Sequence, residues 1–243
     1  MAALSGLPYV YSINNMKVFK HATVVVFLLI GVSASAQFAQ SRSDQFQSSA
    51  RNVYNTADFT YSPLTVSVNF GLNYTVDLHA VSLNWAQYRL LTDNVPVYIQ
   101  YGAGLQYTFG EGDFFGTDEA MSFLSIKVPV SAVYQFDIPN LPLLIVPYAG
   151  LNLQGYILGK GVSTYEDFET GETKTTTYDY FSKEQMGDES LNRIVLGWQI
   201  GARVMYDMYF LGVGYEGPVT SLYKEENLKI NTSQVNISIG IRF

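Results

Sequence analysis

The sequence predicts an all-β protein, a closed eight-stranded antiparallel up-and-down transmembrane β-barrel, and three observations lead to it. Apolar and polar side chains alternate along eight segments with the period of two that marks a strand. Large apolar residues occupy one face of most segments, while glycine, serine, asparagine and glutamine occupy the other. Charged residues make up only 14% of the chain, against about 25% in an average soluble domain.

The alternation begins at Leu64 and returns along the rest of the chain. In the segment 97–109, every second residue from Val97 to Phe109 is apolar, and residues such as Gln100 stand between them. The predicted strands cover 64–74, 78–91, 97–109, 122–136, 143–158, 192–206, 209–222 and 230–243. Many exceed the usual strand length of about 5–6 residues. They suit the roughly 9–11 residues that a tilted strand needs to cross a bilayer.

The large residues on the apolar faces favour a membrane barrel over a soluble barrel or sandwich. The interior of an eight-stranded barrel is narrow and is filled by side chains. Small and polar residues fit such an interior, whereas Trp85, Trp198 and Tyr215 fit the lipid side. Unpaired strand edges are not tolerated in hydrocarbon, so the sheet must close on itself.

The N-terminal region has the pattern of a secretory signal. The basic residues Lys17 and Lys20 precede the apolar run 22–32, and small residues follow up to Ala36. This run is shorter than the roughly 20 residues of a transmembrane helix, so we expect cleavage after Ala36. Residues 1–15 precede the basic region and carry no charge, so we expect the natural start to be Met16. The predicted organisation is a signal region 1–36, a flexible periplasmic arm 37–62 and a barrel 63–243.

The lengths of the connections between strands indicate how the barrel is oriented. The predicted short connections are 92–96, 137–142 and 207–208, and the predicted long ones are 110–121, 160–190 and 223–229. The first hairpin is an exception, with a brief turn near 75–77. Outer-membrane barrels have short periplasmic turns and long external loops, so we expect both termini to be periplasmic.

The last predicted strand carries a resemblance to a known family. Residues Val235–Phe243 alternate and end in phenylalanine. With the even number of strands, this ending resembles the small OmpA/OmpX-type outer-membrane barrels of Gram-negative bacteria, over residues 63–243. The resemblance implies that the barrel-assembly machinery reads Ile239, Ile241 and Phe243. It also implies contact with outer-membrane lipid; since nothing follows the last strand, we expect no peptidoglycan-binding domain.

Five charged residues are predicted to face the lumen: Lys127, Arg193, Arg203, Glu216 and Arg242. Charges inside a narrow barrel are costly unless they are paired, so we expect Glu216 to pair with Arg203 or Arg242. A polar plug that fills the interior is the favoured interpretation. A narrow pore for ions or small solutes is the alternative.

The predicted external loop 160–190 is unusually acidic and aromatic. Its eight acids and three lysines give it a net charge of −5. Five aromatic residues in this loop are candidate surface-binding residues: Tyr165, Phe168, Tyr178, Tyr180 and Phe181. Clustered carboxylates suit Ca²⁺, but no spacing here matches a known calcium loop. We expect no metal and no cofactor.

The sequence offers little material for catalysis or for nucleic-acid binding. Cysteine is absent, and after cleavage the one histidine is His79, with Ser82 on the opposite face of its strand. Residues 37–243 hold 12 basic and 21 acidic residues, a net charge of −9, which repels phosphate backbones. We therefore expect no enzyme and no nucleic-acid partner. The leading hypothesis is a structural or surface-interaction role, followed by the pore and then by a barrel enzyme acting on lipid.

Overall fold

The computed structural model describes residues 52–69, 73–92, 95–114, 117–138, 141–166, 173–186, 190–224 and 228–243. These ranges belong to a compact unit that starts at Ala50. The predicted signal region and most of the predicted arm, residues 1–51, lie outside the described residues. Among the described residues, no helix has the length and apolar character needed to cross a membrane.

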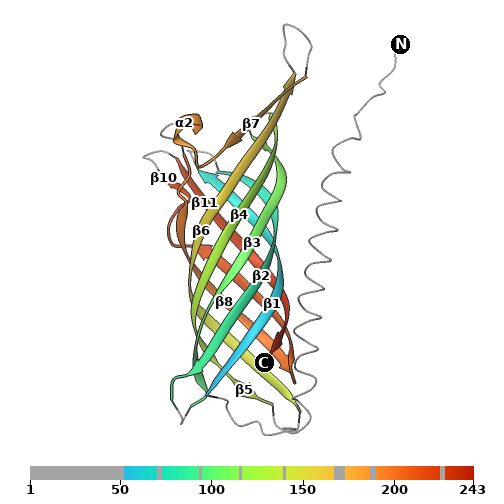
Figure 1. Ribbon diagram of the computed structural model, residues 1–243, viewed down its shortest axis with the longest axis vertical. Helices are drawn as coiled ribbons and strands as arrows, with labels where there is room; N and C mark the ends of the chain where they lie inside the picture. Colours follow the sequence, from blue (N-terminus) through green and yellow to red (C-terminus); the bar gives the residue numbers. More distant parts are fainter. Residues whose placement is uncertain are drawn as a thin grey trace, which may run out of the picture. The chain divides into compact units, whose positions relative to one another are not determined.

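The described chain is a closed antiparallel sheet, so the predicted fold class is confirmed (Figure 1). The elements are β1 (Val53–Asn69), β2 (Asn73–Leu90), β3 (Val97–Phe114), β4 (Thr117–Tyr134), β5 (Phe136–Asp137), β6 (Leu143–Glu166), β7 (Thr173–Asp179), α2 (Lys183–Met186), β8 (Ile194–Tyr206), β9 (Tyr209–Pro218), β10 (Tyr223–Lys224) and β11 (Lys229–Arg242). The ring contains eight long strands in the order β1, β2, β3, β4, β6, β8, β9 and β11.

Pairing between β1 and β11 closes the ring. Their antiparallel ladder runs from Thr56 opposite Arg242 to Asn69 opposite Lys229. Beyond it, the backbones of Asn55 and Phe243 exchange two hydrogen bonds of 2.9 Å each. This seam closes the ring, so the wall presents no open strand edge to hydrocarbon.

The first strand starts earlier than the sequence indicated. β1 begins at Val53, so the prediction of a flexible arm is wrong for 53–62. The predicted turn at 75–77 is also wrong, because Val76 pairs with Val66 inside the β1–β2 ladder. The inward residues from Tyr54 to Ser62 are mostly polar and give little contrast with the outward face.

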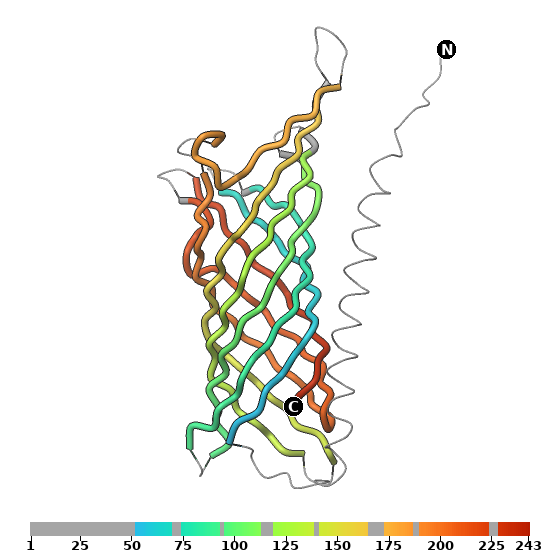
Figure 2. The backbone as a smooth tube through the Cα atoms, viewed as in Figure 1, coloured from blue at the N-terminus to red at the C-terminus, as the bar shows by residue number. Residues whose placement is uncertain are grey.

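Connections of different length lie at the two ends of the barrel (Figure 2). We call the end with residues 91–96, 135–142 and 207–208 the turn end, and the opposite end the loop end. At the turn end, Asp207 has φ of 52° in the two-residue connection of β8 and β9, as tight hairpins require. The predicted long connection 110–121 is wrong, because β3 continues to Phe114 and β4 begins at Thr117.

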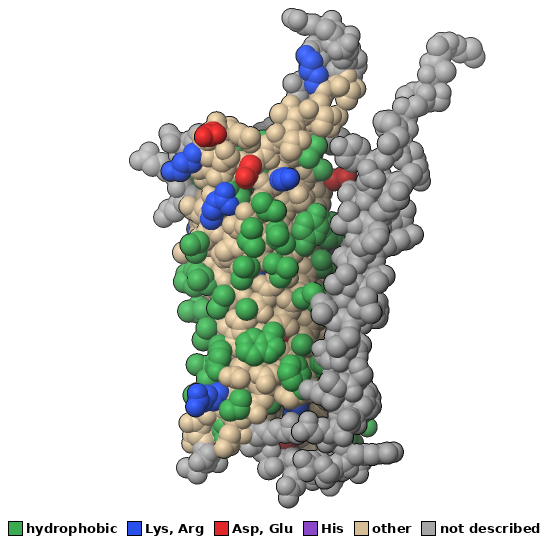
Figure 3. Space-filling view, in the orientation of Figure 1, with side chains coloured by type: hydrophobic (Ala, Val, Ile, Leu, Met, Phe, Trp, Pro, Cys, Tyr) green, Lys and Arg blue, Asp and Glu red, His purple; other side chains and the backbone are tan. Residues whose placement is uncertain are grey.

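The outer wall of the barrel is apolar from β2 to β11. Trp85, Val128, Ile200 and Leu211 are exposed on it, Leu211 by 63%. Figure 3 shows hydrophobic side chains over the middle of the barrel, while charged side chains in this view gather mainly at the loop end. An apolar belt around a closed barrel is the surface that a lipid bilayer covers.

The apolar residues at the end of β1 face inward instead. Leu64, Val66 and Val68 are at most 8% exposed and point into the barrel, so the predicted lipid-facing side of this segment is wrong. They pack in one cluster with Val76 and Leu78 of β2. The interior is therefore apolar at the loop end, a reversal that alternation alone does not reveal.

A charge on the lipid-facing wall is expected to be costly. Val128→Arg places a guanidinium on the apolar belt and should lower the free energy of unfolding by about 2–4 kcal/mol. Ala120→Arg is the matched control, because Ala120 lies further toward the loop end of the same strand, opposite Glu111. It should cost about 0–1 kcal/mol. Urea unfolding from lipid vesicles measures both, and equal costs would contradict the assigned belt.

Candidate functional site

The turn end of the bore is closed by a cluster that we call the aromatic floor, made of Tyr54, Tyr88, Tyr98, Val133, Val146, Met205 and Phe210. The rings of Tyr54 and Tyr88 stack with their centroids 4.4 Å apart. Arg203 lies among these rings, with its guanidinium carbon 4.6 Å from the Tyr148 centroid and a hydrogen bond to the Tyr88 hydroxyl. The ring faces stabilise this buried cation. Gly214 leaves room for Tyr148.

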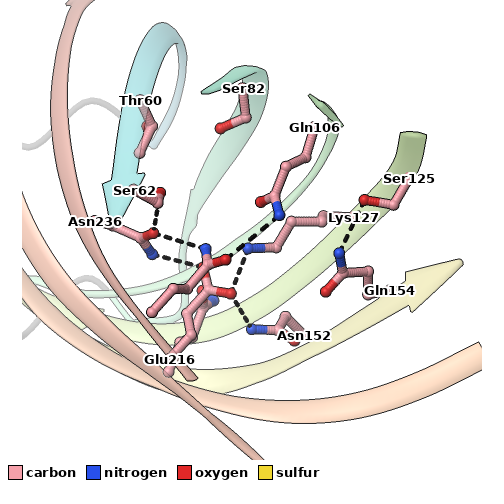
Figure 4. A network of polar contacts seen from close by, with 12 residues as sticks. Thr60, Ser62, Ser82, Gln106, Ser125, Lys127, Asn152, Gln154, Glu216 and Asn236 are labelled. Carbon is pink, nitrogen blue, oxygen red and sulfur yellow. Dashed lines mark hydrogen bonds and ion pairs between the residues drawn. The ribbon is translucent and has the colours of Figure 1, made fainter. Parts of the chain in front are cut away.

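The middle of the bore is filled by a hydrogen-bonded network that we call the polar plug (Figure 4). Lys127 of β4 forms an ion pair with Glu216 of β9 across the interior. The Glu216 carboxylate also accepts hydrogen bonds from Asn152 at 2.9 Å and from Asn236 at 2.7 Å. Since β4 and β9 are not neighbours in the ring, these contacts tie distant parts of the wall together.

Further polar side chains extend the plug to other strands. Ser62 and Gln234 donate to the Asn236 side-chain oxygen at 2.6 and 2.7 Å. Gln106 donates to Gln234 at 3.4 Å, and Gln154 donates to Ser125 at 2.8 Å. A buried network in which members are mutually hydrogen-bonded rigidifies the interior.

The predicted lumen charges have different places in the structure. Lys127, Arg203 and Glu216 do face the interior, but the expected pairing of Glu216 with Arg203 or Arg242 is wrong. Arg193 is exposed at the loop end, where it donates to the Ile157 carbonyl at 3.1 Å and lies 5.0 Å from the centroid of the Phe181 ring. Arg242 is half-buried at the turn end and donates to the Asp207 carbonyl at 3.0 Å.

The loop end of the bore contains a cavity of about 180 Å³. Its walls come from inward residues of the barrel strands, among them Leu64, Val66, Leu78, Met121 and Phe123. Residues of the two long connections roof it, including Tyr180, Met186, Leu191 and Leu222. Eight-stranded barrels are wide enough to hold either packed side chains or one small ligand, and side chains leave this part of the interior open.

Glu119 is the charged residue on the cavity wall that the sequence analysis missed. It is 8% exposed, and its carboxylate accepts a hydrogen bond from the Tyr180 hydroxyl. Burial raises the pKa of Tyr180 and the adjacent carboxylate raises it further, so this phenol stays a donor at neutral pH. The inward register that Glu119 shares with Met121 and Phe123 was the available signal.

Two of the predicted surface-binding aromatics face the barrel interior. Tyr180 stacks on Phe123 with the ring centroids 5.3 Å apart, and Phe181 is only 6% exposed. The Asp179 carboxylate accepts from the Phe181 amide at 2.9 Å, which turns the chain back toward the barrel. Gly159 leaves space for the Phe181 ring. The prediction that Tyr180 and Phe181 bind a surface partner is therefore wrong.

The remaining aromatic candidates belong to a hairpin of β6 and β7. Tyr178 is half-buried against Tyr180, Tyr165 pairs with Lys174, and Phe168 lies outside the described residues. The hairpin rises beyond the rim of the barrel (Figure 1). Its β7 residues Thr173–Thr177 are all exposed. Within the described chain, no three His, Asp or Glu side chains are grouped to hold a metal ion.

His79 lies on the outer wall, away from both the plug and the cavity. Its Nδ1 is 2.8 Å from the Tyr61 hydroxyl. Ser82 points into the barrel and is 6% exposed, so the two residues lie on opposite faces as predicted.

Comparison with solved structures returns small outer-membrane barrels at low sequence identity. The chain is similar to Ail, the attachment invasion locus protein of Yersinia pestis, with 11% identity over 79% of this chain and 100% of that chain, and a TM-score of 0.40. Neisserial surface protein A is 15% identical over 79% of this chain and 98% of that chain, with a TM-score of 0.38. OprG of Pseudomonas aeruginosa is 9% identical over 79% of this chain and 96% of that chain, with a TM-score of 0.43. No protein-family model and no curated protein sequence matches the chain.

The architecture itself defines the class of protein. The closed ring of eight antiparallel strands and its apolar exterior make the chain a small β-barrel of the outer-membrane type. This agrees with the OmpA/OmpX-type resemblance of the sequence.

The Lys127–Glu216 pair should be strongly coupled. Lys127→Met or Glu216→Gln alone leaves a buried group without its partner and should cost about 3–5 kcal/mol of unfolding free energy. The double variant should cost less than the sum, with a coupling of about 0.5–3 kcal/mol. Lys160→Met, on the exposed end of β6, is the control and should stay within about 0.5 kcal/mol. Additive single effects would show that the pair does not hold the plug.

Proposed function

We propose that this protein is an outer-membrane barrel that acts by binding at the cell surface and does not conduct solutes. The observation that carries the proposal is the filling of the bore at two levels. The polar plug occupies the middle, and the aromatic floor occupies the turn end with Tyr88, Tyr98 and Val146 each 0% exposed. Fully buried side chains at such a level favour a closed bore over a water-filled path for a solute.

The β6–β7 hairpin is the proposed interaction surface. Loops on a rigid scaffold carry binding residues more often than the scaffold itself. The outer side chains of the barrel wall contact lipid and its inner side chains pack in the bore, so neither set is free to bind a partner. In contrast, Thr175, Thr176 and Thr177 are exposed on β7. We infer that the loop end, with the connections 167–193 and 219–228, faces outward from the cell, so that both termini are periplasmic.

The last strand supports a second part of the proposal, assembly into the outer membrane. Ile239 is 58% exposed on the outer face of β11, whereas Ile241, two residues further on, is only 9% exposed. The Phe243 backbone completes the seam with Asn55. We propose that Ile239, Ile241 and Phe243 form the strand that the barrel-assembly machinery recognises before closure.

The sealed bore predicts the electrical behaviour of the protein. Purified barrel in planar bilayers should give no discrete conductance steps, because the polar plug and the aromatic floor block the path. A general porin measured in the same bilayers serves as the positive control. Reproducible single-channel steps from this protein would favour the narrow-pore hypothesis.

Shortening the hairpin should separate surface binding from folding. Replacing Thr164–Thr175 by a short Gly-Ser turn keeps Tyr180 and Phe181 in the barrel. The closed ring should persist, seen as different gel migration before and after boiling, because the wall strands still pair. Adhesion of displaying bacteria to cultured epithelial cells should fall to background.

The matched control alters the opposite end of the barrel. Changing Asp207 and Met208 to Asn-Gly keeps a tight hairpin turn and should leave adhesion unchanged. Adhesion that survives removal of the hairpin would place the binding surface elsewhere.

A further inference from the structure

We propose that the cavity at the loop end binds one small aromatic molecule that carries a hydroxyl group, such as a phenol, with Glu119 accepting the hydrogen bond of that hydroxyl. This site is independent of the surface role of the hairpin. It rests on the shape and the lining of the cavity and on Glu119, the one carboxylate among the described residues that line it.

The size of the cavity fits a molecule of one ring. Its volume is about 180 Å³, and an apolar protein cavity of about 150 Å³ is sufficient to bind benzene. The lower parts of the same bore are closely filled by the plug and the floor. An empty apolar cavity loses dispersion contacts that a fitting ligand restores.

The lining favours an aromatic ligand over an aliphatic chain. Phe123, Tyr156 and Tyr180 present rings to the cavity, and ring pairs gain from stacked or edge-on contacts. Met121 and Met186 add thioether groups, which make favourable contacts with aromatic rings.

Glu119 sets the polar end of the ligand. Its carboxylate has two oxygens, and the structure shows the Tyr180 hydroxyl donating to Oε1. A hydroxyl donor on the ligand complements this acceptor, whereas a ligand carboxylate would be repelled by it. The remaining lining is mostly apolar, and its other hydroxyl groups belong to Thr108, Thr232, Tyr156 and Tyr223.

The test uses two probes that differ by one hydroxyl, 4-fluorophenol and fluorobenzene. Their binding to the full chain in lipid nanodiscs is followed by fluorine NMR, and empty nanodiscs correct for partition into lipid. We expect 4-fluorophenol to bind about tenfold or more tightly than fluorobenzene, as a hydrogen bond to a charged group provides. Equal affinities, or no binding above empty nanodiscs, would overturn the proposal.

A cavity-filling variant tests the location of the site. Val66→Phe puts a ring into the cavity and should abolish binding of both probes, since Val66 lines it. Val213→Phe is the matched control, because Val213 is 58% exposed on the outer wall. Binding that survives Val66→Phe would place the site elsewhere.

A second variant tests the acceptor. Glu119→Leu should remove the preference, bringing the affinity ratio of the two probes to about one, while fluorobenzene binding stays within about threefold. A merely structural defect would weaken both probes together. If Glu119→Leu does not insert, Glu119→Gln keeps the size and should still lower the ratio. An unchanged ratio in the inserted variant would contradict the role of Glu119.

Discussion

Closure of eight strands inside a bilayer is the constraint on which the rest of this structure depends. Hydrocarbon offers no hydrogen bonds to strand edges, so β1 must pair with β11 along its length. A ring of eight strands encloses an interior only wide enough for side chains or one small ligand. The outer wall therefore contacts lipid. The side chains that point inward must fill the interior by packing and must satisfy their polar groups with internal hydrogen bonds.

The inward side chains fill the interior in a different way at the middle, the turn end and the loop end of the barrel. In the middle, Lys127 and Glu216 neutralise each other while amides satisfy the carboxylate. At the turn end, Arg203 is held by tyrosine rings rather than by a carboxylate ion pair. At the loop end, apolar residues leave a cavity, and Tyr180 reaches from the long connection to Glu119. The bore is therefore filled at the turn end and hollow at the loop end, so the two ends of the barrel differ in structure.

The sequence was informative where the two faces of a strand differ. From β2 onward, the outer wall followed from alternation, but Tyr54 to Ser62 of β1 showed too little contrast. Alternation shows that a strand has two different faces but does not show which face meets lipid, so the expectation that apolar faces point outward fails at Val66 and Val68. The partner of Glu216 depends on the stagger of strands that are not neighbours. Loop aromatics such as Phe181 can face either way, and only the fold decides between them.

The Cys-free chain permits a direct test of the central claim, a bore sealed below an accessible cavity. Single cysteines are introduced at Thr232, which lines the cavity, and at Ser131, which is 2% exposed in the interior. Each variant is treated with a small methanethiosulfonate reagent in lipid vesicles, and labelling is read by mass spectrometry. The account predicts modification of the Thr232→Cys thiol and protection of the Ser131→Cys thiol. Rapid modification of both would contradict a sealed bore.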